Sequence, residues 1–275
     1  MKRVSIASAM VVVAAVVPAL FAPDAARAQQ GGGAAAAEPA PRMPDGRSDL
    51  SGVWWTGGDV GGRGYGGGRG RGGRGARGGP APPTFTGLYT PAAAEAAKTL
   101  GDKDDPTLKC IPTALGTLNV SFFDVGAVGQ IVSTPAFVVF LTETFHAFRI
   151  VSTDGRPHRE DVPPSYRGDS VGHWEGDVFV VETRNFTDDT WMWAEGRVSP
   201  HSDQLRIVER YRRVDRNTLE IQATVHDPKV LTAPWTVPTQ TLVLAPFDQI
   251  MPLICSGVET GPLMEAAAKQ SADQR

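Results

Sequence analysis

The chain has 275 residues, with 31 Gly, 22 Pro, only 2 Cys and a formal net charge of -3. Fourteen of the glycines lie between Gly57 and Gly79, and residues 84–260 hold 15 Lys and Arg against 23 Asp and Glu. A body of that length can bury a sizeable core as one domain. Its acidic balance argues against a basic nucleic-acid-binding fold, and nothing after residue 30 is long and apolar enough to span a bilayer.

The first 28 residues have the three parts of a secretory signal peptide. Lys2 and Arg3 precede an apolar run from Ala9 to Phe21, and Ala26-Arg27-Ala28 supplies a small-x-small cleavage site. An N-terminal membrane anchor is the alternative, but the apolar run is short and a clean cleavage pattern follows it. We therefore expect a periplasmic or secreted protein whose mature chain has no transmembrane segment.

Export changes the interpretation of the two cysteines, Cys110 and Cys255. In an oxidising compartment, a lone pair of cysteines near the two ends of the folded body is most simply a disulfide. This disulfide would close a loop of more than a hundred residues, and the chain-entropy model gives such a loop a stabilisation of about 4–5 kcal/mol. Two unpaired buried thiols are the alternative, and a catalytic cysteine is less favoured.

Two low-complexity segments precede the folded body. Residues 29–49 are rich in Gln, Gly, Ala and Pro and predict a flexible lead-in. After a possible first strand at residues 49–55, residues 57–83 repeat Arg-Gly-Gly units, which bind RNA in cytosolic proteins. An exported chain rarely meets RNA, and an insert almost without apolar residues cannot fold alone. We expect a disordered insert and no nucleic-acid partner, with contact to an anionic polymer or lipid head group as the alternative.

The pattern of residues 84–260 predicts one all-β domain, which a flexible tail at residues 261–275 follows. Thr90 and Pro91 begin a short helix that Gly101 ends, because the residues between them are mostly helix formers. After Cys110 the chain is rich in β-branched and aromatic residues with a period of two, which predicts strands. The expected strands are residues 117–125, 130–134, 136–143, 145–152, 170–174, 178–183, 204–214, 218–226, 236–244 and 250–255.

Turn residues join these strands into neighbours. Asp154-Gly155, Glu175-Gly176-Asp177 and Asp215-Arg216-Asn217 each lie between expected strands and supply residues that tolerate positive φ. About ten strands joined by short hairpins predict a closed or nearly closed antiparallel β-barrel, with a sandwich as the alternative. The barrel is preferred because closure removes edge strands and leaves an internal cavity.

Several motifs together resemble a family of exported bacterial β-rich proteins that are mostly uncharacterised. The resemblance covers nearly everything from Pro44 to Glu259 except the Gly/Arg insert, and it brings no established reaction. The motifs are Asp49-Leu50-Ser51-Gly52-Val53-Trp54, Asp104-Asp105-Pro106, Thr153-Asp154-Gly155-Arg156-Pro157-His158, Gly172-His173-Trp174-Glu175-Gly176-Asp177, Pro200-His201-Ser202-Asp203 and Glu209-Arg210-Tyr211-Arg212-Arg213-Val214-Asp215.

A second resemblance concerns the start of the domain. Gly52-Val53-Trp54 is similar to the Gly-x-Trp opening of lipocalins, the calycin-type barrels in which this Trp closes one barrel end beneath an Arg from a late strand. The resemblance implies a lipocalin-like barrel here.

His158 is the strongest candidate for acid–base chemistry among the five histidines. It follows the turn Asp154-Gly155-Arg156 and precedes Glu160 and Asp161, so charged groups leave one loop at the strand ends, where ligand groups often collect. Alternatively, Asp154 and Arg156 only pair within the turn. No histidine pair is spaced for zinc on a helix, so a metal would need ligands from separate strands.

Two further histidines have weaker claims. His201-Ser202-Asp203 more often caps a turn than acts as a catalytic group, because neighbours along a strand point apart; the alternative is that His201 enters the same barrel mouth as His158. His146 shares a strand face with Phe148 and Ile150. If that face lines the barrel, His146 is a polar group in an apolar pocket, while a buried structural histidine is the alternative.

Aromatic residues concentrate near the expected loops and suggest a binding surface. Trp191-Met192-Trp193 lies in a polar segment, Asn185 to Arg197, that could act as a lid, and Tyr166 and Trp174 lie near other loops. Aromatic side chains at strand ends can stack on a ligand, although they equally well bury themselves to fix a loop.

These observations favour an exported barrel that binds a small, partly apolar molecule at an aromatic- and His-lined mouth, with no cofactor. The alternative is a cofactor-independent lyase, isomerase or hydrolase in which His158 or His201 is the general base and Asp161 or Arg156 orients or stabilises charge. A third possibility is an envelope-interaction protein that uses the Gly/Arg insert.

Overall fold

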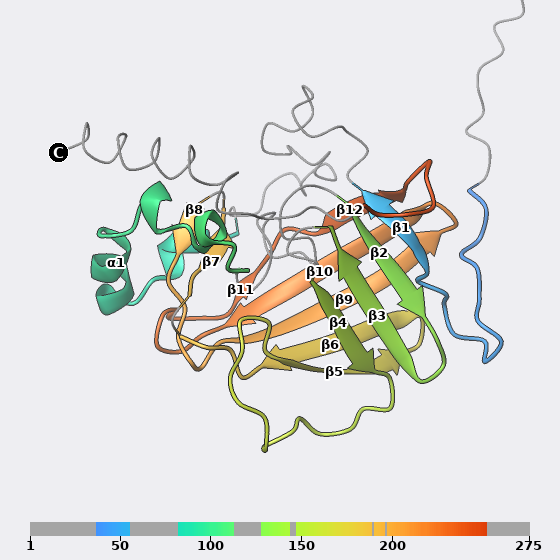
Figure 1. The fold of residues 1–275 in the computed structure, drawn as a ribbon, viewed down its shortest axis with the longest axis horizontal. Coiled ribbons are helices and arrows are strands. Elements are labelled where there is room, and N and C mark those ends of the chain that lie inside the picture. Colours follow the sequence, from blue (N-terminus) through green and yellow to red (C-terminus); the bar gives the residue numbers. More distant parts are fainter. Residues whose placement is uncertain are drawn as a thin grey trace, which may run out of the picture. The chain divides into compact units, whose positions relative to one another are not determined.

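The computed structural model describes residues 37–55, 82–112, 128–143, 147–188, 190–195 and 197–251. These residues form a mostly β structure with a closed barrel of nine strands and one short α-helix (Figure 1). The predicted signal peptide, most of the Gly/Arg insert, the strand expected at 117–125, His146 and Cys255 lie outside the described residues. Within the described ranges, no helix is long and apolar enough to cross a membrane.

Nine strands form the barrel, and the other elements lie around it. The barrel strands are β1 (Gly52–Trp55), β2 (Val128–Ser133), β3 (Phe137–Thr142), β4 (Phe148–Ser152), β5 (Asp169–Glu175), β6 (Val178–Arg184), β9 (Arg206–Asp215), β10 (Thr218–His226) and β12 (Gln240–Leu244). The remaining elements are helix α1 (Pro91–Ala97), the paired strands β7 (Met192–Ala194) and β8 (Arg197–Ser199), strand β11 (Trp235–Thr236), which pairs with β10, and 3-10 turns at Thr86–Leu88, Asp102–Asp104 and Pro106–Lys109.

The strand order closes the sheet on itself. Around the barrel the order is β12, β1, β2, β3, β4, β5, β6, β9 and β10, and β10 pairs again with β12. Every one of these pairings is antiparallel except that of β4 with β5, which is parallel. The turn at Asp154-Gly155 therefore does not form a hairpin, because the loop of residues 153–168 returns the chain so that β5 runs in the direction of β4. The predicted barrel is confirmed, and it is mostly rather than wholly antiparallel.

Most described strands lie close to their expected positions. β10 has the expected bounds, whereas the strand expected at 236–244 is divided into β11 and β12. Pro238 lies at the division, and a proline has no N–H to donate to a ladder. The predicted lid at Asn185 to Arg197 contains strand β7, which pairs with β8.

Trp54 and Arg213 pack against each other where the chain enters β1. Trp54 is fully buried, and its Nε1 donates to the Leu50 carbonyl over 3.0 Å. The guanidinium of Arg213, on the late strand β9, lies 4.8 Å from the centre of the Trp54 ring and donates to the carbonyls of Asp49 and Ser51 over 2.8 and 2.9 Å. The guanidinium of Arg213 thus covers the Trp54 ring and ties the late strand β9 to the backbone that precedes β1.

Two hydrophobic clusters stabilise the fold. Inward-facing residues of the barrel strands fill the interior, with Trp54, Phe140, Phe179 and Tyr211 as its largest members. A second cluster joins α1, β7 and the ends of β9 and β10, and Figure 1 shows these elements gathered at one end of the barrel. Thr90 caps α1 as predicted, because its hydroxyl accepts from the Ala93 N–H over 3.2 Å.

A buried ionic group lies inside the barrel among the hydrophobic residues. Arg149 on β4 donates to the two carboxylate oxygens of Glu209 on β9 over 2.6 and 3.3 Å. Tyr211 contacts both, because its hydroxyl donates to Glu209 over 2.6 Å and accepts from Arg149 over 3.1 Å. Burial opposes the charge of Arg149, but Glu209 and Tyr211 outweigh it and raise the pKa of Arg149 above its ordinary value. Burial raises the pKa of the Tyr211 hydroxyl well above its ordinary value, and the Glu209 charge adds to this.

Candidate functional site

The barrel interior leaves little room for a ligand in the described part of the chain. Besides the hydrophobic side chains, the space beside Phe140, Arg149 and Arg167 holds about 0 Å³ that a water-sized sphere can enter. Small-molecule pockets usually measure about 300–1,000 Å³. The candidate site must therefore be sought outside the barrel wall.

A row of polar side chains crosses four neighbouring strands on the outer wall. Asp169 on β5 pairs in register with Arg184 on β6, and Arg206 on β9 pairs with His226 on β10. The β6–β9 ladder runs to Thr183 and Ile207, both buried, so Arg184 and Arg206 lie opposite each other one step further and face outward. The register thus places two arginines side by side.

The loop of residues 153–168 lies against this row and is held by specific hydrogen bonds. The Asn185 side chain donates to the Val162 carbonyl over 3.1 Å, and the Ser165 N–H donates to the Asn185 carbonyl over 3.2 Å. Asn185 has a φ of 65°, a conformation that asparagine tolerates better than most residues. These contacts fix the loop as one wall of a cleft.

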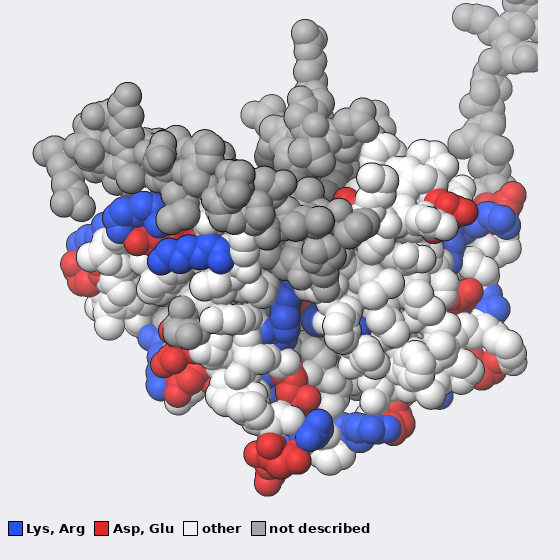
Figure 2. Space-filling view, viewed as in Figure 1, with Lys and Arg blue, Asp and Glu red and all other residues white. Residues whose placement is uncertain are grey.

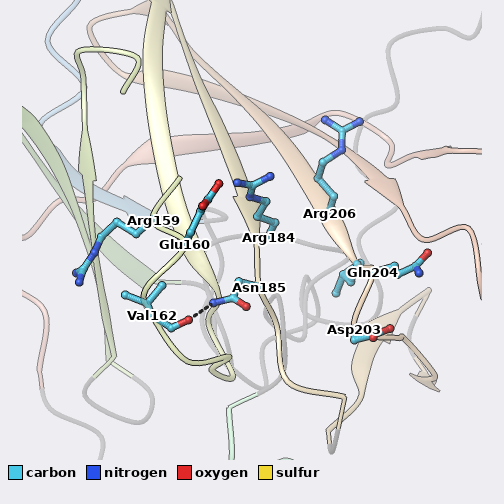
Figure 3. Close-up of a pocket in the computed structure, with 9 residues that line it drawn as sticks. Arg159, Glu160, Val162, Arg184, Asn185, Asp203, Gln204 and Arg206 are labelled. Carbon is cyan, nitrogen blue, oxygen red and sulfur yellow. Dashed lines mark hydrogen bonds between the residues drawn. The ribbon is translucent and has the colours of Figure 1, made fainter. Parts of the chain in front are cut away.

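The cleft has a volume of about 380 Å³ and is open to solvent. Three segments form it: the loop, the end of β6 and the residues that lead into β9. Figure 3 shows the Arg184 and Arg206 side chains extending from their strands toward the same side, with Glu160 entering from the loop. The lining residues are Arg159, Glu160, Val162, Arg184, Asn185, Asp203, Gln204, Leu205 and Arg206.

His158 packs beside the cleft with two carboxylates. Its Nδ1 lies 2.7 Å from Asp169 Oδ2, and its Nε2 lies 3.5 Å from Glu182 Oε1. The other Glu182 oxygen accepts from Arg206 over 2.8 Å. The His158 side chain is only 6% exposed, so it lies under the loop against the outer wall. No group of three or more His, Cys, Asp or Glu residues suited to a metal occurs among the described residues.

His226 belongs to the same row of polar side chains, and the neighbouring charges affect its pKa. Burial lowers the pKa of His226 below its ordinary value, and the nearby Arg206 charge lowers it further, while Glu182 acts in the opposite direction. A positive potential from Arg206 therefore reaches the imidazole on the next strand.

The other predicted catalytic residues have local partners. Arg156 pairs with Asp154 over 2.7 Å within the turn, and its hydrogen bonds lower the pKa of Asp154 to about 2. Asp161 pairs with Arg159 over 3.1 Å. The loop thus holds these charges in exposed ion pairs. This agrees with the alternative that Asp154 and Arg156 only pair with each other within the turn.

His201 lies in different surroundings from His158. It is buried, its Nδ1 lies 3.2 Å from the Ser202 carbonyl, and its ring lies 6.3 Å from that of Phe186. Ser202 donates through both its N–H and its hydroxyl to Asp227 over 2.7 Å, which fixes the turn before β9. These contacts match the favoured turn-capping interpretation, and no described contact joins His201 to His158.

The expected aromatic mouth is not assembled in the described part of the chain. Trp174 is half-buried and packs against the barrel core with its ring 5.1 Å from Phe179, and Tyr166 is half-buried in the loop of residues 153–168. Trp191 is half-buried before β7, and the Trp193 side chain lies outside the described residues.

Strand β4 presents the face of Phe148 and Ile150 to solvent. These side chains are 62% and 59% exposed, whereas Arg149 is buried, and Figure 2 shows few charged side chains on the outer surface over β2 to β4. The sequence placed His146 in the barrel only if the face of Phe148 and Ile150 lines the interior. In the described part of the strand this face points to solvent instead. Cys110 is described but Cys255 is not, so their disulfide stays a prediction.

Sequence reasoning missed Arg184, Arg206 and Glu182. Their outward positions follow from alternation along β6 and β9, but β7 and β8 separate the two strands in sequence. A signal that could have found them is the alternation of polar and apolar residues along both strands, which places Glu182, Arg184 and Arg206 on the outward faces.

Comparison with known proteins adds no identification. No family model, no curated protein and no solved structure matches the chain. The proposals below therefore rest on the residues and the geometry of this chain.

Proposed function

We propose that this chain is an exported protein that binds a small molecule through an anionic group held between Arg184 and Arg206. The observation that carries the proposal is the placement of these two guanidinium groups on neighbouring strands at one cleft. Arg206 donates one guanidinium N–H to Glu182 over 2.8 Å, so a bound anion would pair with Arg184 and with the remaining N–H donors of Arg206. Guanidinium groups match carboxylates and phosphates because their N–H donors form a planar fork.

The remaining lining supports a small and partly apolar ligand. A volume of about 380 Å³ lies at the lower end of the usual range for small-molecule pockets. Val162 and the buried Leu205 offer apolar contacts, and the side chains of Asn185 and Gln204 offer amide groups. A short-chain acid or a small phosphorylated compound fits this combination.

The experiment is an NMR titration of the arginine Nε–H signals with acetate, propionate and inorganic phosphate. We expect Arg184 and Arg206 to shift together with one dissociation constant. Replacing either by Met should weaken binding about ten- to a hundredfold, since a hydrogen bond to a charged group contributes about 1.5–3 kcal/mol.

Arg212→Met is the matched control for this titration. Arg212 lies on the same strand as Arg206, faces outward and is ion-paired with Glu220 over 3.3 Å, but it does not line the cleft. Its replacement should leave binding unchanged within about twofold. Equal losses for Arg206→Met and Arg212→Met, or a titration to which Arg184 does not respond, would show that the arginines attract anions only non-specifically.

A second candidate function follows from the contact between His158 and Asp169. Asp169 Oδ2 lies 2.7 Å from His158 Nδ1 and orients the ring, while the buried Nε2 has no hydrogen-bond partner among the described residues and lies 3.5 Å from Glu182 Oε1. Such a histidine could act as general base in a cofactor-independent hydrolase, isomerase or lyase. Hydrolysis of p-nitrophenyl esters by the purified protein, lost in His158→Asn and Asp169→Asn and retained in His173→Asn, would support this candidate. Rates equal to that of free imidazole would exclude it for these esters.

A further inference from the structure

The charges around the cleft are largely neutralised by fixed ion pairs. Asp203 is paired with Lys229 over 2.6 Å, Arg159 with Asp161 over 3.1 Å, and Arg206 with Glu182 over 2.8 Å. The Lys229 ammonium holds the pKa of Asp203 below its ordinary value, and Arg159 does the same for Asp161. Most charges that line the cleft therefore already have a partner.

Two charged residues in the lining have no such pair. The Arg184 guanidinium and the Glu160 carboxylate line the cleft, and both residues are exposed. Neither forms an ion pair or a side-chain hydrogen bond with another residue in the described part of the chain, nor do they pair with each other. They leave from different walls, Arg184 from the end of β6 and Glu160 from the loop of residues 153–168 (Figure 3).

We infer that the ligand of this cleft is zwitterionic, with an anionic group at Arg184 and Arg206 and a cationic group at Glu160. This inference rests on the proposed function, because it takes the anion site as given. A small amino acid or another short molecule with an ammonium and a carboxylate has the required chemistry. A ligand with both charges satisfies both residues, whereas a simple anion satisfies only the arginines.

Arg184 and Glu160 line the same cleft without forming an ion pair, so a single ligand with two charges can pair with both. The Asn185 contact to Val162 fixes the loop two residues after Glu160, and Glu160 lines the cleft together with Asp203 and Gln204. The cleft is thus complementary to a short dipolar molecule.

The test compares acids with and without an amino group at pH 7.5. The probes are propionate against β-alanine, butyrate against γ-aminobutyrate, and valerate against 5-aminovalerate, each titrated by NMR. Because the distance between the charges selects a chain length, we expect one amino acid to bind at least about fivefold more tightly than its desamino partner. This difference corresponds to a partly exposed ion pair.

Variants assign the difference to Glu160. Glu160→Gln should bring the preferred amino acid to the affinity of its desamino partner and leave the desamino acid unchanged. Arg184→Gln should weaken both. Glu220→Gln, on the outer face of β10 and outside the cleft, is the matched control and should change neither.

The outcomes separate the two proposals. If the desamino acids bind but no amino group adds affinity, or if Glu160→Gln does not remove the difference, the zwitterion inference is overturned and the anion site stands. If none of the six acids and no phosphate binds, the proposed function itself fails.

Discussion

Replacing Glu209 by Gln should strongly destabilise the barrel, because it leaves Arg149 charged and buried without its counter-ion. The two side chains are 0% and 7% exposed and join through contacts of 2.6 and 3.3 Å. At an effective dielectric constant of 20, two unit charges about 4 Å apart attract by about 4 kcal/mol. Removing one partner of a buried pair typically costs about 3–5 kcal/mol.

That loss is large relative to the stability of a domain, which is about 5–15 kcal/mol. Urea unfolding followed by circular dichroism measures it, with an unchanged slope of free energy against urea as evidence that the unfolding transition is the same. The matched control is Glu175→Gln, which breaks an exposed pair with Arg210 over 2.7 Å. Such a pair contributes about 0.2–1 kcal/mol.

A combined replacement separates the charge from the packing. Arg149→Met, Glu209→Leu and Tyr211→Phe together remove the charges and the hydroxyl of these three residues while keeping similar volumes, and the buried Arg167 near Glu209 keeps its charge. This variant should recover most of the stability lost in Glu209→Gln, because apolar replacements of a buried ion pair are often neutral or stabilising. If Glu209→Gln and Glu175→Gln cost the same, the reasoning from burial is refuted.

Two further predictions concern other parts of the barrel. Burial and the Arg206 charge lower the pKa of His226, so the unfolded chain binds this proton more readily and stability should fall as the pH drops below about 6.5. In His226→Gln the decrease in melting temperature between pH 7.5 and 5.5 should be smaller, and an unchanged decrease would contradict the assignment. Gly172→Ala places a Cβ 2.5 Å from the Phe179 ring and should cost about 1–3 kcal/mol in urea unfolding. Gly101→Ala, which meets no atom within 4 Å, should be nearly neutral, and equal costs would exclude the steric explanation.

Much of the fold could be predicted from local patterns. The alternation of Leu219, Ile221, Ala223 and Val225 predicted β10 with its correct bounds, since a period of two places apolar side chains on one face. Thr90 predicted the start of α1 because its hydroxyl can cap the helix. These features depend on neighbours within a few residues.

The parallel pairing of β4 with β5 could not be predicted in this way. The turn residues Asp154 and Gly155 indicate a reversal but not where the chain goes next, and the loop continues to residue 168. The same loop decides the environment of His158, which the sequence placed at a barrel mouth and the structure places against the outer wall beside Asp169 and Glu182.

The sequence by itself determined the all-β class, the barrel and a loop of charged residues around His158, because strand periodicity and turn chemistry are local properties. Only the tertiary structure decided which charges meet. Arg184 and Arg206 are separated by the β7–β8 hairpin and become neighbours through the β6–β9 ladder. Glu160 lines their cleft because Asn185 fixes the loop at Val162. Pairing between distant strands sets these contacts, and a single chain's pattern does not specify the partner of each strand.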